Sequence, residues 1–255
     1  LSGPGYERYG YHLAGIPFPL LAHNRDNAYG LTMFQNDDID FFREEVRPGD
    51  PGMYRRGDRW KAFETLRRRI AVQGADSVDF SYRRTDLGPL VNDALPAVEA
   101  EEPVSMSWVY TEGPNEVLQA LFGISHAADL PSFARAVAKI HAPGLNVMYG
   151  DAQGHIAWWA AARLHHYPDS VSTKVFLEGK MAGTDGKKPL PFDKNPMAIN
   201  PPWGYVYSAN NQPDSTAGSG FVPGYYLPEN RARRITALLE ASDTWDRGGV
   251  MEMIL

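Results

Sequence analysis

Short apolar runs separated by turn-forming residues dominate the first hundred positions. The run at 17–21 (Pro-Phe-Pro-Leu-Leu) continues to Asn24, and the run at 70–72 (Ile-Ala-Val) precedes Gly74. Apolar runs of this length that end at Asn, Gly or Asp are typical of strands joined by tight turns. We therefore expect residues 1–100 to form mainly β structure.

The spacing of apolar residues changes to a helical period at 115–122 and again at 131–141. In the second stretch Phe133, Val137 and Ile140 fall on related faces, with Asp129 near the start and Pro143-Gly144 as the stop. A further helix is predicted from about Pro228, because apolar residues at 235, 238 and 239 again recur at helical spacing.

Two β-prone runs, 145–149 and 155–159, flank a Gly-Asp-Ala-Gln-Gly segment, which predicts a hairpin. Prolines interrupt residues 189–202, so we expect a long irregular loop there. Strands, then helices, then strands and a helix favour an α+β fold over a doubly wound parallel sheet. With no repeat or low-complexity linker, we predict no internal domain boundary within 1–255.

Composition narrows the possible partners. The 255 residues include 43% hydrophobic ones, enough for a sizeable core, and the formal net charge of −6 disfavours binding to nucleic acid. Without cysteine there is neither a disulfide nor a thiolate metal site in this chain. No apolar run approaches the roughly 18 residues of a membrane span, so we expect no membrane association.

Familiar catalytic motifs are missing from the chain. There is no G-x-S-x-G elbow, no H-E-x-x-H, no P-loop and no dinucleotide fingerprint. Two weaker patterns remain. The run Asp37-Asp38-Ile39-Asp40 is a solvated acidic loop or a cation site, and Asn210-Asn211 is an ordinary turn or a source of neutral N–H donors for an oxyanion.

A set of segments follows one another along the chain in a recognisable order: Gly15 to Asn24, Ala28 to Thr32, the acidic run with Phe42 and Glu44, Arg84 to Pro89, Asn146 to Gly154, Pro191 to Asn211, and Asn230-Arg231 with Arg234-Ile235. Together these segments resemble the nucleophile-bearing chain of the penicillin acylase (penicillin amidase) family of N-terminal-nucleophile hydrolases. Tyr29 stands where the family usually has Trp, and Leu87 stands where it commonly has His.

The resemblance implies a layered αββα sandwich, here incomplete, and it assigns specific catalytic roles to an N-terminal residue. In the family a Ser freed by self-cleavage of a precursor attacks the amide, and its own α-amine is the base. An α-amine has an ordinary pKa near 8, so no histidine is needed. Ser2, followed by Gly3-Pro4, does not resemble the family's start, and we expect the nucleophile segment upstream of Leu1, in a companion chain or segment.

Carried over residue by residue, the resemblance assigns the oxyanion hole to the Asn210 side chain and the Met33 backbone N–H. Arg231 is then expected to orient Asn210 or the substrate. Five apolar positions align with the acyl pocket, although ordinary core packing explains leucines there equally well. These positions are Leu20, Leu21, Leu31, Phe122 and Leu145.

The resemblance also implies a structural calcium ion, held by Asp37, Asp40 and the carbonyl of Ile39. The family's later acidic ligand has no counterpart, because Phe221, Val222 and Gly224 occupy that neighbourhood and the nearest carboxylate is the more distant Asp214. No organic cofactor is expected. Calcium is therefore an expectation that the sequence supports only in part.

The activity implied is hydrolysis of a linear amide in a small N-acyl compound, either a penicillin-like β-lactam side chain or an acyl-homoserine lactone. Such enzymes serve antibiotic biosynthesis or quorum quenching, and the family implies a periplasmic or secreted location. The alternative is a non-catalytic, calcium-stabilised relative that binds or has a structural role. A sugar-binding domain built on Trp158, Trp159 and Trp203 has weaker support.

Overall fold

The computed structural model describes residues 1–95, 101–183, 187–213 and 222–254. Contacts divide the chain into two compact units, although composition shows no boundary between them. Unit 1 comprises Leu1–Asn36, Asn115–Leu164 and Leu190–Leu255, and unit 2 comprises Asp37–Pro114 and His165–Pro189.

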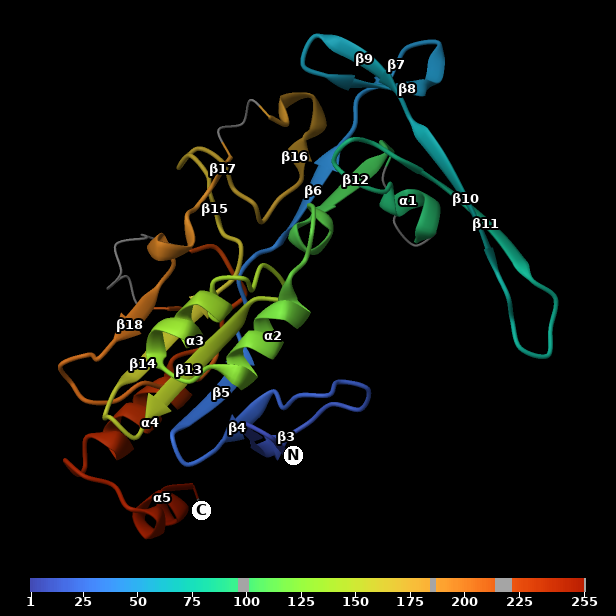
Figure 1. Ribbon diagram of the computed structural model, residues 1–255. Helices are drawn as coiled ribbons and strands as arrows, with labels where there is room; N and C mark the ends of the chain where they lie inside the picture. Colours follow the sequence, from blue (N-terminus) through green and yellow to red (C-terminus); the bar gives the residue numbers. More distant parts are fainter. Residues whose placement is uncertain (96–100, 184–186, 214–221, 255) are drawn as a thin grey trace. The chain divides into compact units, whose positions relative to one another are not determined.

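Unit 1 is built on a six-stranded antiparallel sheet (Figure 1). The strand order, β18-β14-β13-β5-β4-β3, puts the predicted hairpin β13–β14 at its centre, with Val147 opposite both Leu31 and Trp159. The strands are β3 (Tyr9–Tyr11), β4 (Leu21–His23), β5 (Asn27–Met33), β13 (Leu145–Asp151), β14 (Ile156–Ala161) and β18 (Met197–Ile199); β1 (Ser2–Gly3) pairs with β2 (Tyr6–Glu7) apart from them.

Two helices cover one face of this sheet, α2 (Val117–His126) and α3 (Leu130–Val137) (Figure 1). Asp129 and Ser132 form a capping box at the start of α3, which satisfies N–H groups that the first turn would otherwise leave unpaired. Phe133 and Ile124 are fully buried against Val147 and Trp159. Strand alternation sends these sheet residues to one face, and that is why the core forms there.

The opposite face of the sheet holds Phe34, Ala160 and Leu164 in a second, smaller core. Helix α4 (Asn230–Leu239) lies on this side of the sheet. Its Thr236 and its C-cap residue Glu240 line the same cavity as Trp158 of β14. The chain ends in α5 (Arg247–Ile254), and a short 3-10 turn, η3, spans Phe192–Lys194.

Unit 2 consists of small sheets. Strands β12 (Val104–Trp108), β6 (Ile39–Arg43) and β16 (Leu177–Glu178) form one, in which β16 runs parallel to β6. The others are β7-β8-β9 (Val46–Arg47, Asp50–Arg56, Arg59–Ala62), the long hairpin β10-β11 (Glu64–Ile70, Val78–Arg84) and β15-β17 (His165–His166, Lys188–Pro189), with α1 (Val91–Ala94) and the 3-10 turns η1 (Val109–Thr111) and η2 (Gly179–Met181).

The predicted β-rich start, the hairpin and the three helices are confirmed, with helix ends shifted by a few residues. The loop at 189–202 is corrected in part: Met197–Ile199 joins the sheet as edge strand β18, since Pro196 and Pro201 flank rather than interrupt it.

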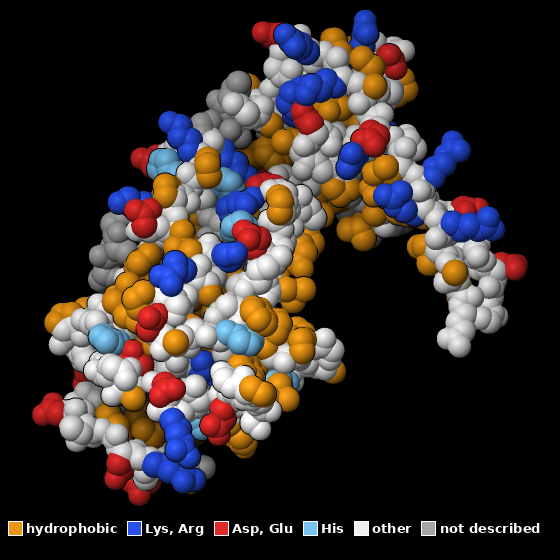
Figure 2. All heavy atoms as spheres, viewed as in Figure 1, with side chains coloured by type: hydrophobic (Ala, Val, Ile, Leu, Met, Phe, Trp, Pro, Cys, Tyr) orange, Lys and Arg blue, Asp and Glu red, His pale blue; other side chains and the backbone are white. Residues whose placement is uncertain are grey.

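Charged side chains of both signs are intermixed with hydrophobic ones on the face shown in Figure 2. Among the residues that the structure describes, no helix is both long enough and apolar enough to cross a bilayer.

Candidate active site

Asn210 lies against the end of β5, as the sequence predicts. Its side-chain Nδ2 donates a 2.8 Å hydrogen bond to the carbonyl of Met33, 177 positions away in sequence. Asn210 has a φ of 58°, in the left-handed region that non-glycine residues seldom adopt and that Asn tolerates best. In this backbone conformation the side-chain amide of Asn210 points towards β5.

The backbone N–H of Met33 points to the same edge of β5 as the Met33 carbonyl. Phe34 donates its N–H to Gly144 across the β5–β13 ladder, so the alternation of an antiparallel pair directs the N–H and C=O of Met33 to the other edge of β5. Strand β4 pairs with β5 only at Ala28 and Tyr29. Among the described residues, the edge at Met33 is therefore left open by the neighbouring strand.

A second side-chain amide, that of Asn146, also donates to the Met33 carbonyl. Asn146 on β13 donates its Nδ2 to this oxygen at 3.0 Å and accepts the indole N–H of Trp158 at 3.0 Å. The two amides satisfy both lone pairs of the carbonyl, and one N–H of the Asn210 amide remains available for another acceptor. The loop itself is tied to β5 by a 2.6 Å contact between the hydroxyls of Ser208 and Thr32.

Arg231, in the first turn of α4, fixes the orientation of Asn210. Its Nη1 donates to Asn210 Oδ1 at 3.2 Å and to the carbonyl of Ala209 at 3.1 Å. Because the guanidinium can only donate, it holds Asn210 Oδ1 on its own side and leaves Nδ2 directed at Met33. The structure brings the three predicted residues into one hydrogen-bonded chain.

The five pocket candidates are not all on one surface. Leu31 and Leu145 pack on the helix-covered core, on the face that alternation also gives to the Met33 side chain. Leu21 lies differently: its side chain approaches the position that a substituent on Gly30 would take, so it faces the side of the sheet opposite to Leu31. Phe122 is 52% exposed and stacks on His126, and Leu20 is half-buried just before β4.

An aromatic cavity of about 390 Å³ lies within unit 1 beside the amide cluster. Asn146 and Trp158 form its sheet side, and Ser208 and Asn211 belong to the loop that carries Asn210. None of the five pocket candidates is in its described wall, which also includes Trp203, Tyr205, Tyr207, Thr236 and Glu240. Trp159, by contrast, is a core residue on the opposite face.

The sequence analysis did not predict this cavity, although Trp158 and Trp203 of its wall were among the tryptophans considered for sugar binding. Residues 203–207, with three aromatic side chains within five positions, are a further signal in the sequence. Asn146 was noted only as part of a hairpin motif. Its contact with Met33 depends on the register that places Asn146 opposite Thr32, and register cannot be read from the two segments separately.

The acidic run belongs to unit 2 and is largely withdrawn from solvent. Burial raises the pKa of Asp37, a shift that a hydrogen bond with Thr173 opposes, and burial also raises the pKa of Asp38. Asp37 Oδ2 is buried without a hydrogen-bond partner, which is the observation in favour of a cation. Asp40 differs, since it accepts hydrogen bonds from the Tyr167 hydroxyl and from Lys187 Nζ.

The donor set does not fit calcium. A calcium ion takes six to eight oxygen ligands, and within the described part of the chain no three acidic or histidine side chains are grouped to hold a metal. The ammonium of Lys187 is 3.1 Å from Asp40 Oδ2, so a cation already contacts this carboxylate. Phe221, at the position of the family's later ligand, and Asp214 lie outside the described residues.

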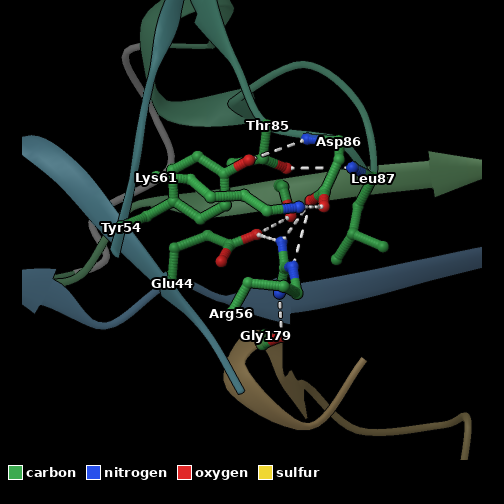
Figure 3. A network of polar contacts seen from close by, with 9 residues as sticks. Glu44, Tyr54, Arg56, Lys61, Thr85, Asp86, Leu87 and Gly179 are labelled. Atoms are coloured by element: carbon green, nitrogen blue, oxygen red, sulfur yellow. Dashed lines mark hydrogen bonds and ion pairs between the residues drawn. The ribbon is translucent and has the colours of Figure 1, made fainter. Parts of the chain in front are cut away.

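The segment at 84–89 serves an ion network elsewhere in unit 2 (Figure 3). Arg56 on β8 donates to Glu44, which is fully buried, to Asp86 and to the carbonyl of Gly179. Although burial favours the neutral acid, Arg56 and Lys61 lower the pKa of Asp86. This part of the family pattern therefore has a structural role in this chain, and Leu87 takes no part in ion pairing in Figure 3.

Comparisons with known proteins identify the family of the chain. The sequence profile of the family described as Penicillin amidase matches residues 1–255. The chain is 25% identical to an acyl-homoserine lactone acylase, QuiP, of Pseudomonas aeruginosa over 99% of its length, and 26% identical to penicillin G acylase of Escherichia coli over 96%. It spans 31% and 29% of those proteins, respectively, so about a third of their length.

The fold has a counterpart among solved structures. A thermostable penicillin G acylase from Alcaligenes faecalis superposes with a TM-score of 0.82 at 22% identity, covering 99% of this chain and 45% of that one. This match confirms the predicted α+β fold class. With its profile matched from end to end, the chain belongs to the penicillin amidase family.

Proposed function

We propose that this chain supplies the oxyanion hole of an amidase that cleaves the linear amide of a small N-acyl compound. The observation that carries the proposal is the contact between Asn210 Nδ2 and the Met33 peptide, with Arg231 behind the amide. Two neutral N–H donors then face one point, where an oxygen can gain negative charge. Family membership supports the reaction class.

In the proposed reaction an N-terminal Ser outside these 255 residues attacks the substrate carbonyl, and its own α-amine takes the proton. The carbonyl oxygen becomes an oxyanion, which accepts hydrogen bonds from the Met33 N–H and the second Asn210 N–H. The amine leaves with a proton, and water then hydrolyses the acyl-enzyme. Donors fixed before the reaction need no reorganisation, and for this reason each contributes about 3–4 kcal/mol in tested hydrolases.

The substrate class is an N-acyl compound with an apolar acyl group, such as an acyl-homoserine lactone or a β-lactam with an aromatic side chain. The names of the relatives support this choice, and so do Leu31 and Leu145 next to Met33. An apolar acyl group gains roughly 25 cal/mol per Å² by leaving water.

The test is Asn210→Ala in the full-length protein, assayed for release of the amine from an N-acyl substrate. We expect kcat to fall by at least about a hundredfold while the melting temperature stays near that of the parent. Asn211→Ala is the matched control, because within the described part of the chain Asn211 bonds only to neighbouring backbone, and turnover should stay within about twofold. Near-full turnover in Asn210→Ala would falsify the proposal, and a parent protein without any hydrolysis would favour the non-catalytic alternative.

A further inference from the structure

Lys187 lies at the centre of a polar cluster in unit 2 that contains the end of the acidic run. Its Nζ is 3.1 Å from Asp40 Oδ2 and 3.3 Å from Glu112 Oε1. It also lies over the ring of Tyr167, 5.6 Å from the centroid. A single ammonium thus contacts two carboxylates and an aromatic face at once.

The cluster is shielded from water, so its charges interact strongly. The side chains of Asp40 and Lys187 are 9% and 18% exposed, compared with 61% for Lys194, a lysine paired at the surface. Ordinary surface lysines remain solvated and pair weakly. With less water to screen it, the Lys187 ammonium interacts more strongly with the carboxylates it contacts than an exposed lysine would.

The remaining hydrogen bonds are arranged around that charge. Tyr167 donates its hydroxyl to Asp40, and Ser107 donates to Glu112 at 2.9 Å. Both carboxylates are therefore held as acceptors facing the ammonium. A divalent ion bound to Asp40 would meet the Lys187 ammonium at close range, and this like-charge approach is unfavourable.

We propose that Lys187 is the built-in cation of this cluster, and that it replaces calcium as the counter-ion of Asp40. The acidic run is then stabilised by the chain's own ammonium, and its stability does not depend on calcium. The inference is independent of the proposed catalytic role, since every group involved belongs to unit 2.

The experiment compares the full-length parent with Lys187→Met, which keeps the apolar stem and removes the charge. Thermal unfolding is followed in EDTA and at about 5 mM CaCl2, above the Kd of weak extracellular calcium sites. We expect the parent to melt within about 1 °C in both buffers, and Lys187→Met to melt at least about 5 °C lower in EDTA. Calcium should recover part of that loss only in the variant, because its carboxylates are now uncompensated.

Lys188→Met is the matched control, since Lys188 is the exposed neighbour and should behave as the parent. Calcium binding measured by equilibrium dialysis should be greater for Lys187→Met than for Lys188→Met. The proposal is overturned if the parent gains stability from calcium and Asp40→Asn abolishes the gain, or if the two lysine variants unfold alike in EDTA. Should Lys187→Met not fold, the parent and Asp40→Asn still decide the question.

Discussion

The two units use polar side chains in opposite ways. In unit 1 the cluster at Met33 consists of neutral amides, and Asn210 is half-buried with one N–H uncommitted. In unit 2 the network around Arg56 consists of charges that neutralise one another, and Glu44 is fully buried. A site that stabilises a transient charge needs hydrogen-bond donors that are still available, whereas a structural network stabilises the fold with donors that are already paired. Variants in the two clusters should therefore separate catalysis from stability.

The largest expected effect is on stability, from Arg56→Met. It leaves the Glu44 carboxylate buried without its counter-ion, which costs about 3–5 kcal/mol of unfolding free energy. Urea unfolding of the full-length protein measures this loss, and kcat per folded molecule should not change. Arg55→Met is the control, because the Arg55–Glu45 pair is exposed to solvent and should contribute little to stability. Equal losses in the two variants would contradict the assignment of Arg56.

A smaller and purely kinetic effect is expected from Arg231→Met. This residue acts through Asn210 Oδ1, so its loss should let the amide rotate and lower kcat about tenfold, with little change in KM. Steady-state kinetics with an N-acyl substrate provide the measurement. Arg233→Met tests the helix without touching the site, since Arg233 pairs with Glu229 on the exposed side of α4. A loss shared by both variants would point to the helix instead of the amide.

The smallest effect is the response of stability to acid. A hydrogen bond from Arg83 lowers the pKa of Asp93, although burial opposes it, so the folded protein releases this proton more readily than the unfolded chain. The stability from Asp93 is complete above the unfolded pKa near 3.9 and is lost as pH falls through the lowered folded value. Asp93→Asn should therefore have a shallower decline of unfolding free energy below about pH 4, and an unchanged slope would refute this.

The sequence predicted the local elements well, because strands, turns and helices leave periodic signals. The hairpin at 145–159 and the helix after Pro228 are examples. It also identified Asn210, Met33 and Arg231 as partners, although only through the resemblance. Nothing in the spacing of residues 33 and 210 could place them in contact, since their meeting depends on the whole intervening fold.

Side-chain direction was harder to predict than the elements themselves. The resemblance grouped Leu21 with Leu31, but Leu21 approaches the side of the sheet to which a substituent on Gly30 would point, whereas Leu31 packs on the helix-covered core. For the acidic run the sequence left both a solvated loop and a cation site open, and it gave no sign of Lys187, which donates to Asp40 from 147 positions away. Ion pairing over such a separation leaves no local pattern.

The interleaving of the two units has a consequence for biosynthesis. The chain passes from one unit to the other at 36/37, 114/115, 164/165 and 189/190, so neither unit is a continuous stretch of the gene. On the ribosome, β5 emerges more than a hundred residues before its partner β13. Until β13 is synthesised, the edge of β5 that pairs with it has no partner strand. We therefore expect the sheet to form slowly, through contacts between residues far apart in sequence. Subcloning either unit at a single cut would discard part of its own sheet or network.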